Sequence, residues 1–189
     1  MASAPAPFER LEAAHYGAIL ADPPWRFETW SDKGKGRSAE RHYKTMSFEE
    51  ICELPVASLA KRDAALFLWA TWPLLEDALD VMRVWGFTYK TCGFCWMKVN
   101  STRSHVGPLW QGTGYWTRAN TEVCLLATRG HPRRKHADVP QALLARRREH
   151  SRKPPTVHAR IRRLVGGPYL ELFARERRPG WAAWGNEVR

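Results

Sequence analysis

The chain has 189 residues, of which 44% are hydrophobic, enough for one folded domain with its own core and too many for a chain disordered throughout. No uninterrupted apolar run approaches the roughly 20 residues of a membrane-spanning helix, and the first residues lack the basic start and apolar centre of a secretory signal. We therefore expect a cytoplasmic protein with no membrane partner.

The excess of positive over negative charge lies entirely in the last third of the chain. Residues 1–128 carry 14 Lys and Arg against 14 Asp and Glu, whereas residues 129–189 carry 16 against 5. The formal net charge of +11 therefore arises after Thr128. A charge run can be only a solvated face, but an excess this one-sided favours a polyanionic partner, and we expect nucleic acid.

Apolar periodicity predicts strands that alternate with helices. In chain order, the sequence predicts strands over 18–21, 66–71, 94–99, 123–128 and 169–174, with a further strand within 180–187. It predicts helices from the capping box Ser47–Glu50 to Pro55, over 74–85 before Gly86, near 141–148 and near 156–165. This alternation indicates an α/β sheet with its site at the strand ends. We expect a single domain over 1–189, with 1–16 as a flexible N-terminal segment.

Cys92 and Cys95 form one CxxC pair inside an aromatic, strand-like run. The sequence has no second such pair and no His pair at zinc-finger spacing. We expect buried thiols and no metal, with a metal or redox role as the alternative.

A carboxylate, two prolines and an aromatic ring follow the first expected strand, in Asp22-Pro23-Pro24-Trp25. Two prolines fix φ twice and remove two backbone donors, so a plain turn that ends the strand is one interpretation. A functional interpretation depends on the stretches that accompany this turn along the chain.

Those stretches are "SRKPP" (151–155), "YLELFAR" (169–175) and "GWAAWGNE" (180–187), with "RHYKTMS", "LFLWAT", "WGF", "WMK" and "GYWTRANTEVCLLATRG" between the first turn and the last strands. With DPPW and in this order, they resemble the MT-A70 family of adenine-N6 methyltransferases over nearly the whole chain, and its small bacterial and phage members most. The resemblance implies a Rossmann-like S-adenosylmethionine-dependent methyltransferase fold. Its α/β architecture has a mostly parallel central sheet with helices on both faces and a permuted motif order.

The resemblance implies that Asp22, Pro23, Pro24 and Trp25 are catalytic. An adenine amine is a poor nucleophile because its lone pair is delocalised into the ring. The Asp22 carboxylate and the Pro23 carbonyl would accept its two N–H bonds, and the rigid prolines would hold both acceptors in place. Trp25 would pack against the base.

The resemblance also implies S-adenosylmethionine as the cofactor. Lys153 would meet the methionine carboxylate as a point charge, and Asn186 and Glu187 would contact the ribose or adenine. Some relatives carry Gln where this chain has Glu187. The remaining residues implied at the cofactor are Asp22, Glu171, Leu172, Phe173 and Arg175.

By the same resemblance, Tyr43, Trp116 and Arg118 border the substrate base, with mobile surface loops as the alternative. The expected function is methylation of adenine N6 in nucleic acid, with DNA favoured over RNA, on a flipped or single-stranded base. The alternatives are a non-catalytic nucleic-acid-binding partner subunit and a simple basic binding module. Family members often pair, so we expect a homodimer.

Overall fold

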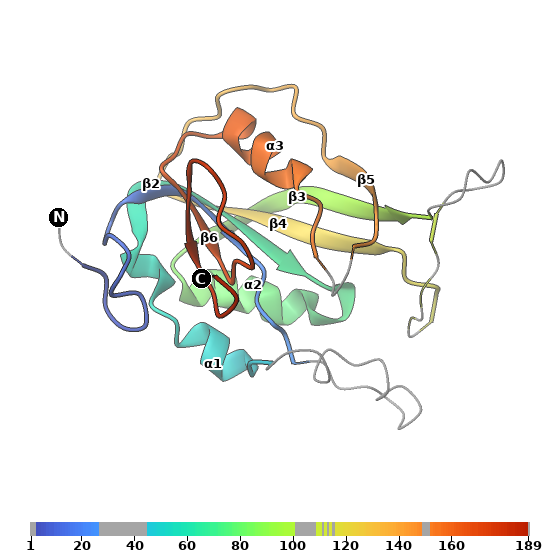
Figure 1. Ribbon diagram of the computed structural model, residues 1–189, viewed down its shortest axis with the longest axis horizontal. Coiled ribbons are helices and arrows are strands. Elements are labelled where there is room, and N and C mark those ends of the chain that lie inside the picture. The colour runs from blue at the N-terminus through green and yellow to red at the C-terminus, as the bar shows by residue number, and fades with distance from the viewer. Residues whose placement is uncertain are drawn as a thin grey trace.

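A seven-stranded sheet forms the centre of the structure (Figure 1). The computed structural model describes residues 3–26, 45–100, 109–110, 112, 114, 116–148 and 152–188. The strand order is β5-β3-β4-β2-β1-β6-β7. The strands are β1 (Tyr16–Ala21), β2 (Ala60–Ala70), β3 (Thr88–Val99), β4 (Thr121–Arg129), β5 (Ala142–Arg146), β6 (Tyr169–Leu172) and β7 (Trp181–Trp184).

Strand direction gives the sheet two unlike edges. β4 pairs antiparallel with β2 and β3, and the other neighbours pair parallel. Among the described strands, six therefore run one way and only β4 runs the other. The carboxyl ends of the six, together with the start of β4, form what we call the carboxyl edge, and the opposite ends form the amino edge. The expected mostly parallel sheet is confirmed.

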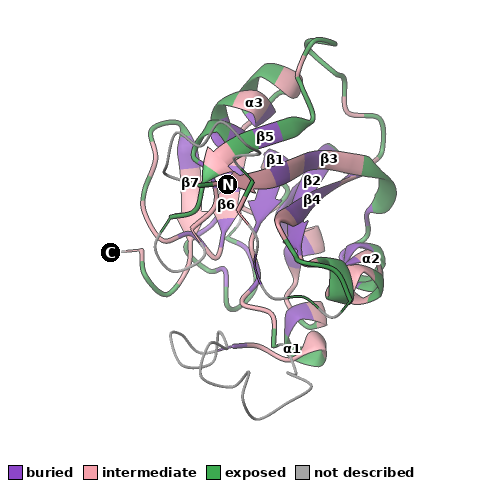
Figure 2. Ribbon diagram, turned by 90° about the vertical axis from the view of Figure 1, so that its right-hand side faces the viewer, coloured by how far each residue is buried: buried purple, intermediate pink, exposed green. Residues whose placement is uncertain are grey.

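Helices cover both faces of the sheet, as expected. On one face, α1 (Phe48–Cys52) and α2 (Leu75–Val84) bury Ile51 and Val81 in one hydrophobic cluster. On the other face, α3 (Thr156–Leu164) buries Val157 and Ile161 in a second cluster. Two short 3-10 helices, η3 (Val56–Ser58) and η4 (Trp72–Leu74), join these elements. Figure 2 shows buried residues along the strands and exposed residues on the outer sides of the helices.

Local sequence signals set the ends of α1 and α2. The backbone N–H of Glu50 donates to the Ser47 hydroxyl at 3.2 Å, and the Ser47 N–H donates to the Glu50 carboxylate at 2.7 Å, which completes the predicted capping box. At the end of α2, Gly86 has φ of +80°, a left-handed conformation that glycine adopts without a Cβ clash. Both predicted helix boundaries are confirmed.

The predicted basic helix over 141–148 is wrong, because this segment is the edge strand β5, parallel to β3. Leu143 is 2% exposed and Leu144 is 64% exposed, so neighbouring side chains point to opposite faces, as in a strand. The Arg160 side chain donates to the carbonyls of Pro140 and Ala142, at 2.7 and 2.6 Å. In so short a segment, sheet pairing and this side-chain contact outweigh helix propensity.

The N-terminal residues, expected to be flexible, pack onto the core through Ala4, Phe8 and Leu11. Phe8 is fully buried, and its ring meets Trp184 of β7 edge-on, with 4.9 Å between centroids. The Trp184 indole N–H donates to the Pro7 carbonyl at 3.1 Å. This contact covers the sheet next to β7.

The strand order places β6, which comes late in the chain, beside the first strand. β1 and β6 are neighbours in the sheet. The connection that follows β1 leads to β2 on one side of this pair, and the connection that follows β6 leads to β7 on the other side. Parallel α/β sheets open a crevice where the connections diverge in this way. The carboxyl ends of β1 and β6 therefore mark the position of the site.

No helix in the described part of the chain has the length and apolar character needed to cross a membrane.

Candidate active site

Asp22 follows β1 directly and lies at the carboxyl edge. Backbone bonds hold the turn after it. The Trp25 N–H donates to the Pro23 carbonyl at 2.8 Å, and the Met46 N–H donates to the Pro24 carbonyl at 2.9 Å. The Asp22 side chain is 27% exposed. The turn therefore presents a carboxylate that is partly withdrawn from water and fixed in direction.

Lys153 comes from a distant part of the chain to meet Asp22. Its ammonium donates to both carboxylate oxygens, at 2.7 and 2.8 Å, and lies 3.3 Å from an oxygen of Glu122. The residue sits just before α3, next to Pro154 and Pro155, which restrict the approach of the chain. The side chain is 14% exposed, so this is a largely desolvated ion pair.

Glu122 and Lys98 extend this pair into a chain of alternating charges that sequence reasoning missed. Lys98 donates to Glu122 at 2.5 Å, so Glu122 lies between two ammonium groups. Glu122 is the second residue of β4 and Lys98 is close to the end of β3, which places both at the carboxyl edge. The sequence held no signal for this position, because Glu122 lies near the start of its strand and only the antiparallel direction of β4 brings that start to the carboxyl edge.

Burial and pairing act against each other on these groups. Burial raises the pKa of Asp22 above its ordinary value, although the ammonium of Lys153 opposes this rise. Burial also raises the pKa of Glu122, but Lys153 and Lys98 outweigh it and leave that pKa below the usual range. For Lys153, burial alone would lower the pKa, and the two carboxylates outweigh it and raise the pKa. The three groups therefore stabilise one another in charged form.

A pocket opens beside Asp22 and Lys153 between the ends of β1 and β6. Leu20, Trp69, Val157 and Phe173 supply apolar parts of its wall. Phe173 has φ of +61°, a left-handed conformation that is uncommon for a bulky residue and is concentrated at functional sites. The charged and polar lining is Asp22, Arg152, Lys153, His158, Glu171, Arg175, Glu176 and Arg178.

His158 is a second residue that sequence reasoning missed. It is buried in α3, and its Nε2 lies 2.8 Å from a carboxylate oxygen of Glu171. Its Nδ1 lies 3.3 Å from the Pro155 carbonyl, and its ring meets Trp181 edge-on. His158 thereby holds the Glu171 side chain at the pocket. In the sequence it is only a helix histidine at an apolar position.

The expected cofactor residues divide into two groups. Glu171, Phe173 and Arg175 line the same pocket as Asp22 and Lys153. Leu172 is fully buried in the core and does not line it, because side chains alternate along β6. Asn186 and Glu187 are exposed and lie outside the pocket lining, and Glu187 reaches Arg175 at 3.5 Å.

The expected substrate residues lie away from the pocket or outside the described chain. Trp116 is fully exposed and Arg118 is exposed, and neither lines the pocket. Tyr43 lies outside the described residues. Trp25 is half-buried, and its indole N–H donates to the Trp69 carbonyl at 2.9 Å, which ties the DPPW turn to the end of β2.

The charged, polar and apolar groups that line the pocket fit the chemical groups of the expected cofactor, S-adenosylmethionine. This molecule carries a sulfonium, an ammonium, a carboxylate and a ribose, and the lining offers carboxylates, cations and apolar surface. The indole N–H of Trp69 is buried and has no acceptor among the described residues, and the same holds for Nε of Arg178. Buried donors of this kind are costly unless a ligand or water satisfies them.

None of the four thiols lines this pocket. Burial raises the pKa of the Cys92 thiol to about 11, so it stays protonated near neutral pH. Cys92 and Cys95 are half-buried in β3 as free thiols. Within the described ranges, no group of three or more His, Cys, Asp or Glu could hold a metal ion.

Comparison with known proteins agrees with this architecture. The MT-A70 family model matches residues 16–187. The chain is 31% identical to the Type II methyltransferase M.MunI of a Mycoplasma species, over 96% of this chain and 81% of that protein. It is 30% identical to an N(6)-adenosine-methyltransferase MT-A70-like protein of Arabidopsis thaliana and 27% identical to the human N(6)-adenosine-methyltransferase catalytic subunit METTL3. Each of these matches covers 92% of this chain, but only 24% and 28% of the relatives.

Proposed function

The chain belongs to the MT-A70 family of adenine-N6 methyltransferases, and we propose that it transfers a methyl group from S-adenosylmethionine to the N6 amine of an adenine in nucleic acid. The observation that carries this proposal is the position of Asp22. Its carboxylate is fixed after β1, partly desolvated and paired with Lys153, and it faces the pocket between β1 and β6.

The residues of the DPPW turn would activate the adenine amine. The Asp22 carboxylate and the Pro23 carbonyl each accept a hydrogen bond from one N–H group of the N6 amine. These two hydrogen bonds favour a localised lone pair on that nitrogen. The Pro23 oxygen already accepts the Trp25 N–H and keeps a second lone pair. Because both acceptors are held by the rigid turn, little ordering is needed at reaction.

Charge balance gives Asp22 a second role. S-adenosylmethionine, when bound, supplies a methyl group on a sulfonium whose positive charge disappears as the S–C bond breaks and the N–C bond forms. The amine then carries the positive charge until one N–H proton leaves, and the Asp22 carboxylate is placed to accept that proton. The Lys153 ammonium opposes the rise in the pKa of Asp22 that burial causes, and so favours the ionised carboxylate.

Lys153 and the end of β6 would hold the cofactor. We assign the methionine carboxylate to Lys153, which already contacts Asp22, and the remainder of the molecule to Glu171, Phe173 and Arg175. Lys153→Ala should then weaken S-adenosylmethionine binding more than nucleic-acid binding. Titration of both ligands against the variant checks this order, and the reverse order would contradict the assignment.

We favour DNA over RNA as the substrate. The similarity extends over 81% of the bacterial Type II methyltransferase, whereas it is confined to 24% and 28% of the plant and human adenosine methyltransferases. Homodimer formation and a cytoplasmic location stay predictions.

The direct test is methyl transfer from labelled S-adenosylmethionine to matched single-stranded DNA, duplex DNA and RNA, with the modified nucleoside identified by mass. We expect N6-methyladenine, mostly in a DNA pool, and no product with Asp22→Asn. Cofactor binding without product in any pool would favour the non-catalytic partner subunit. Failure to bind cofactor would overturn the proposal.

A further inference from the structure

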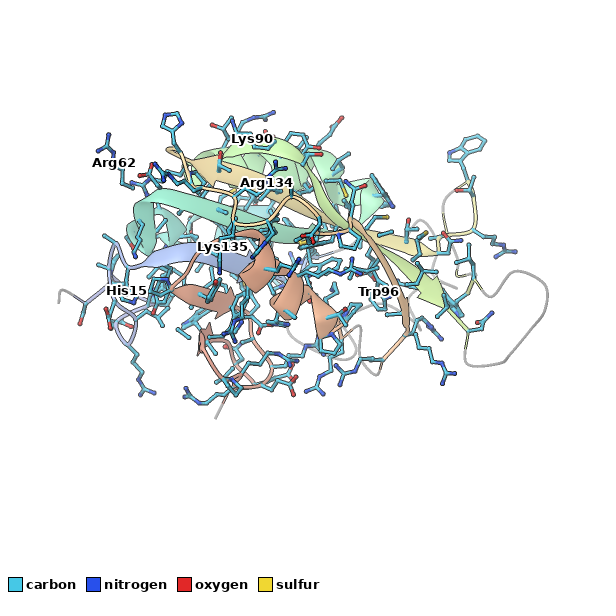
Figure 3. The ribbon with its side chains drawn as sticks, turned by 90° about the horizontal axis from the view of Figure 1, so that it is seen from above. His15, Arg62, Lys90, Trp96, Arg134 and Lys135 are labelled. Carbon is cyan, nitrogen blue, oxygen red and sulfur yellow. The ribbon has the colours of Figure 1, made fainter. Side chains whose placement is uncertain are left out.

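A stack of alternating aromatic and cationic side chains stands at the carboxyl edge, at the β5 end of the sheet. The Lys98 ammonium lies 5.2 Å from the ring centroid of Trp96 and 5.6 Å from that of Trp110. On Trp110, the guanidinium carbon of Arg147 lies 4.0 Å from the ring centroid. Figure 3 shows Trp96 far from Arg62, which lies at the other end of the molecule.

The inner members of this stack already have partners. Trp96 is buried and donates its indole N–H to the Ala145 carbonyl at 2.9 Å, which holds β5 against β3. Lys98 donates to Glu122, which also contacts Lys153. The stack is therefore continuous with the charge network around Asp22, and its outer end is Arg147.

Trp110 is a fixed support for Arg147. Its backbone N–H donates to the Lys98 carbonyl at 2.8 Å. Gly112 approaches its ring so closely that a Cβ at that position would lie 2.3 Å from a ring carbon. The ring is half-buried, whereas Arg147 is exposed. A guanidinium stacked on a fixed ring loses less freedom when it binds an anion than a free side chain would.

Arg147 and Asp22 lie at the same edge but not in the same pocket. From β1 to β5 the sheet crosses four strand spacings, which is about 19 Å at 4.8 Å each. Arg146 and Arg148 flank Arg147 and are exposed as well. A polyanion that lies along the carboxyl edge with one unit at Asp22 would reach this cluster.

We propose that Arg147, supported by Trp110, binds a backbone phosphate of the substrate strand at a fixed distance from the target adenine. This inference rests on the proposed function and adds a second contact to it. A span of about 19 Å corresponds to at most about six nucleotides of a stacked strand at 3.4 Å each. The guanidinium fork suits a phosphate, and the aromatic support keeps it in one orientation.

The test uses single-stranded deoxyoligonucleotides that contain one adenine and a flank of two to ten nucleotides on one side only. Equilibrium binding to the full chain is measured by fluorescence anisotropy at several salt concentrations. For wild type, affinity should rise in a step when the flank on one side reaches the spanning length, at about six nucleotides or fewer. Arg147→Ala should remove this step and reduce the slope of log affinity against log salt by about 0.7, the value for one phosphate on a single strand.

Arg62→Ala is the matched control, because it removes one exposed arginine near the amino end of β2, away from the carboxyl edge. It should leave the step and the slope unchanged. Trp110→Leu should lose part of the Arg147 effect, and the losses in Trp110→Leu/Arg147→Ala should not add, because one residue acts through the other. Thermal unfolding confirms that each variant is folded.

Two results would overturn the inference. If Arg147→Ala binds as Arg62→Ala does at every flank length and salt concentration, Arg147 only braces β5. If the two losses add, Trp110 does not act through Arg147. Methyl transfer by the wild type, alongside either result, would leave the proposed function intact. Wild type that binds no oligonucleotide and methylates none would overturn both proposals.

Discussion

The two edges of the sheet use their polar groups in opposite ways. At the amino edge, polar groups form hydrogen bonds that hold neighbouring segments together. The Gly17 N–H donates to the Pro168 carbonyl at 2.9 Å, and the Asp63 carboxylate accepts a hydrogen bond from the His131 N–H at 2.7 Å. At the carboxyl edge, Asp22, Lys153 and Glu122 pair with one another beside an open pocket. The polar groups at the amino edge are used within the fold, while those at the carboxyl edge include charged groups that line a pocket.

The largest expected effect is on catalysis at the carboxyl edge. Asp22→Asn keeps the shape of the side chain but removes the negative charge and the proton acceptor, so transfer should fall by about 10³-fold or more. Asp63→Asn, the matched change at the amino edge, should leave transfer unchanged. Steady-state methylation rates of the two folded variants test this prediction. Equal losses of rate would contradict the assignment of catalysis to the carboxyl edge alone.

The same carboxylate predicts a pH dependence. Burial raises the pKa of Asp22. Only the ionised form can take up the proton, and it also accepts the hydrogen bond from N6 more strongly than the protonated form does. Activity of the wild type should therefore be full above this raised pKa and fall as the pH drops through it, at a higher pH than for an ordinary Asp. A pH profile that stays flat down to the ordinary Asp range would show that Asp22 does not control the rate.

Removal of the shared cation should cost stability. Lys153→Met removes the ammonium between Asp22 and Glu122, so Asp22 loses its cation and Glu122 keeps only Lys98, which should lower the free energy of unfolding by about 3 kcal/mol at neutral pH. The cost should shrink at lower pH, because protonation of either carboxylate relieves the repulsion. Urea unfolding at two pH values measures this, with exposed Lys90→Met as the control. A pH-independent cost would point to lost packing instead.

A change at the amino edge should affect stability and leave the chemistry intact. A Cβ at Gly17 would lie 2.8 Å from the Gly167 carbonyl oxygen, and backbone cannot easily move away. Gly17→Ala should lower the free energy of unfolding by about 1–3 kcal/mol while methylation per folded molecule stays unchanged. Gly166→Ala is the control, since a Cβ there meets nothing within 4 Å. Similar melting temperatures for the two variants would contradict the prediction.

The smallest effect is expected at a helix end that belongs to neither edge. Ser47→Ala removes the hydroxyl that accepts the Glu50 N–H and should cost about 1 kcal/mol of unfolding free energy. Ser47→Asp retains an acceptor at the cap and should recover most of the loss. Chemical unfolding of the two variants decides whether the cap or the serine itself matters.

Local signals in the sequence predicted the elements that local contacts form. The capping box at Ser47 and the glycine stop at Gly86 each depend on residues within a few positions, and both appear as expected. The helix prediction for residues 141–148 was wrong, because the conformation of this segment depends on pairing with β3 and on the contact with Arg160, both distant in the chain.

The sequence by itself determined the family, the alternation of strands and helices, and the carboxylate and proline turn at Asp22, because each is a pattern of neighbouring residues. Only the tertiary structure decided which charges meet. Lys153 reaches Asp22 across 131 positions, Glu122 lies between Lys98 and Lys153, and His158 holds Glu171. The pKa of a charged group depends on its burial and on its partner. The mostly parallel sheet brings these partners together at one edge.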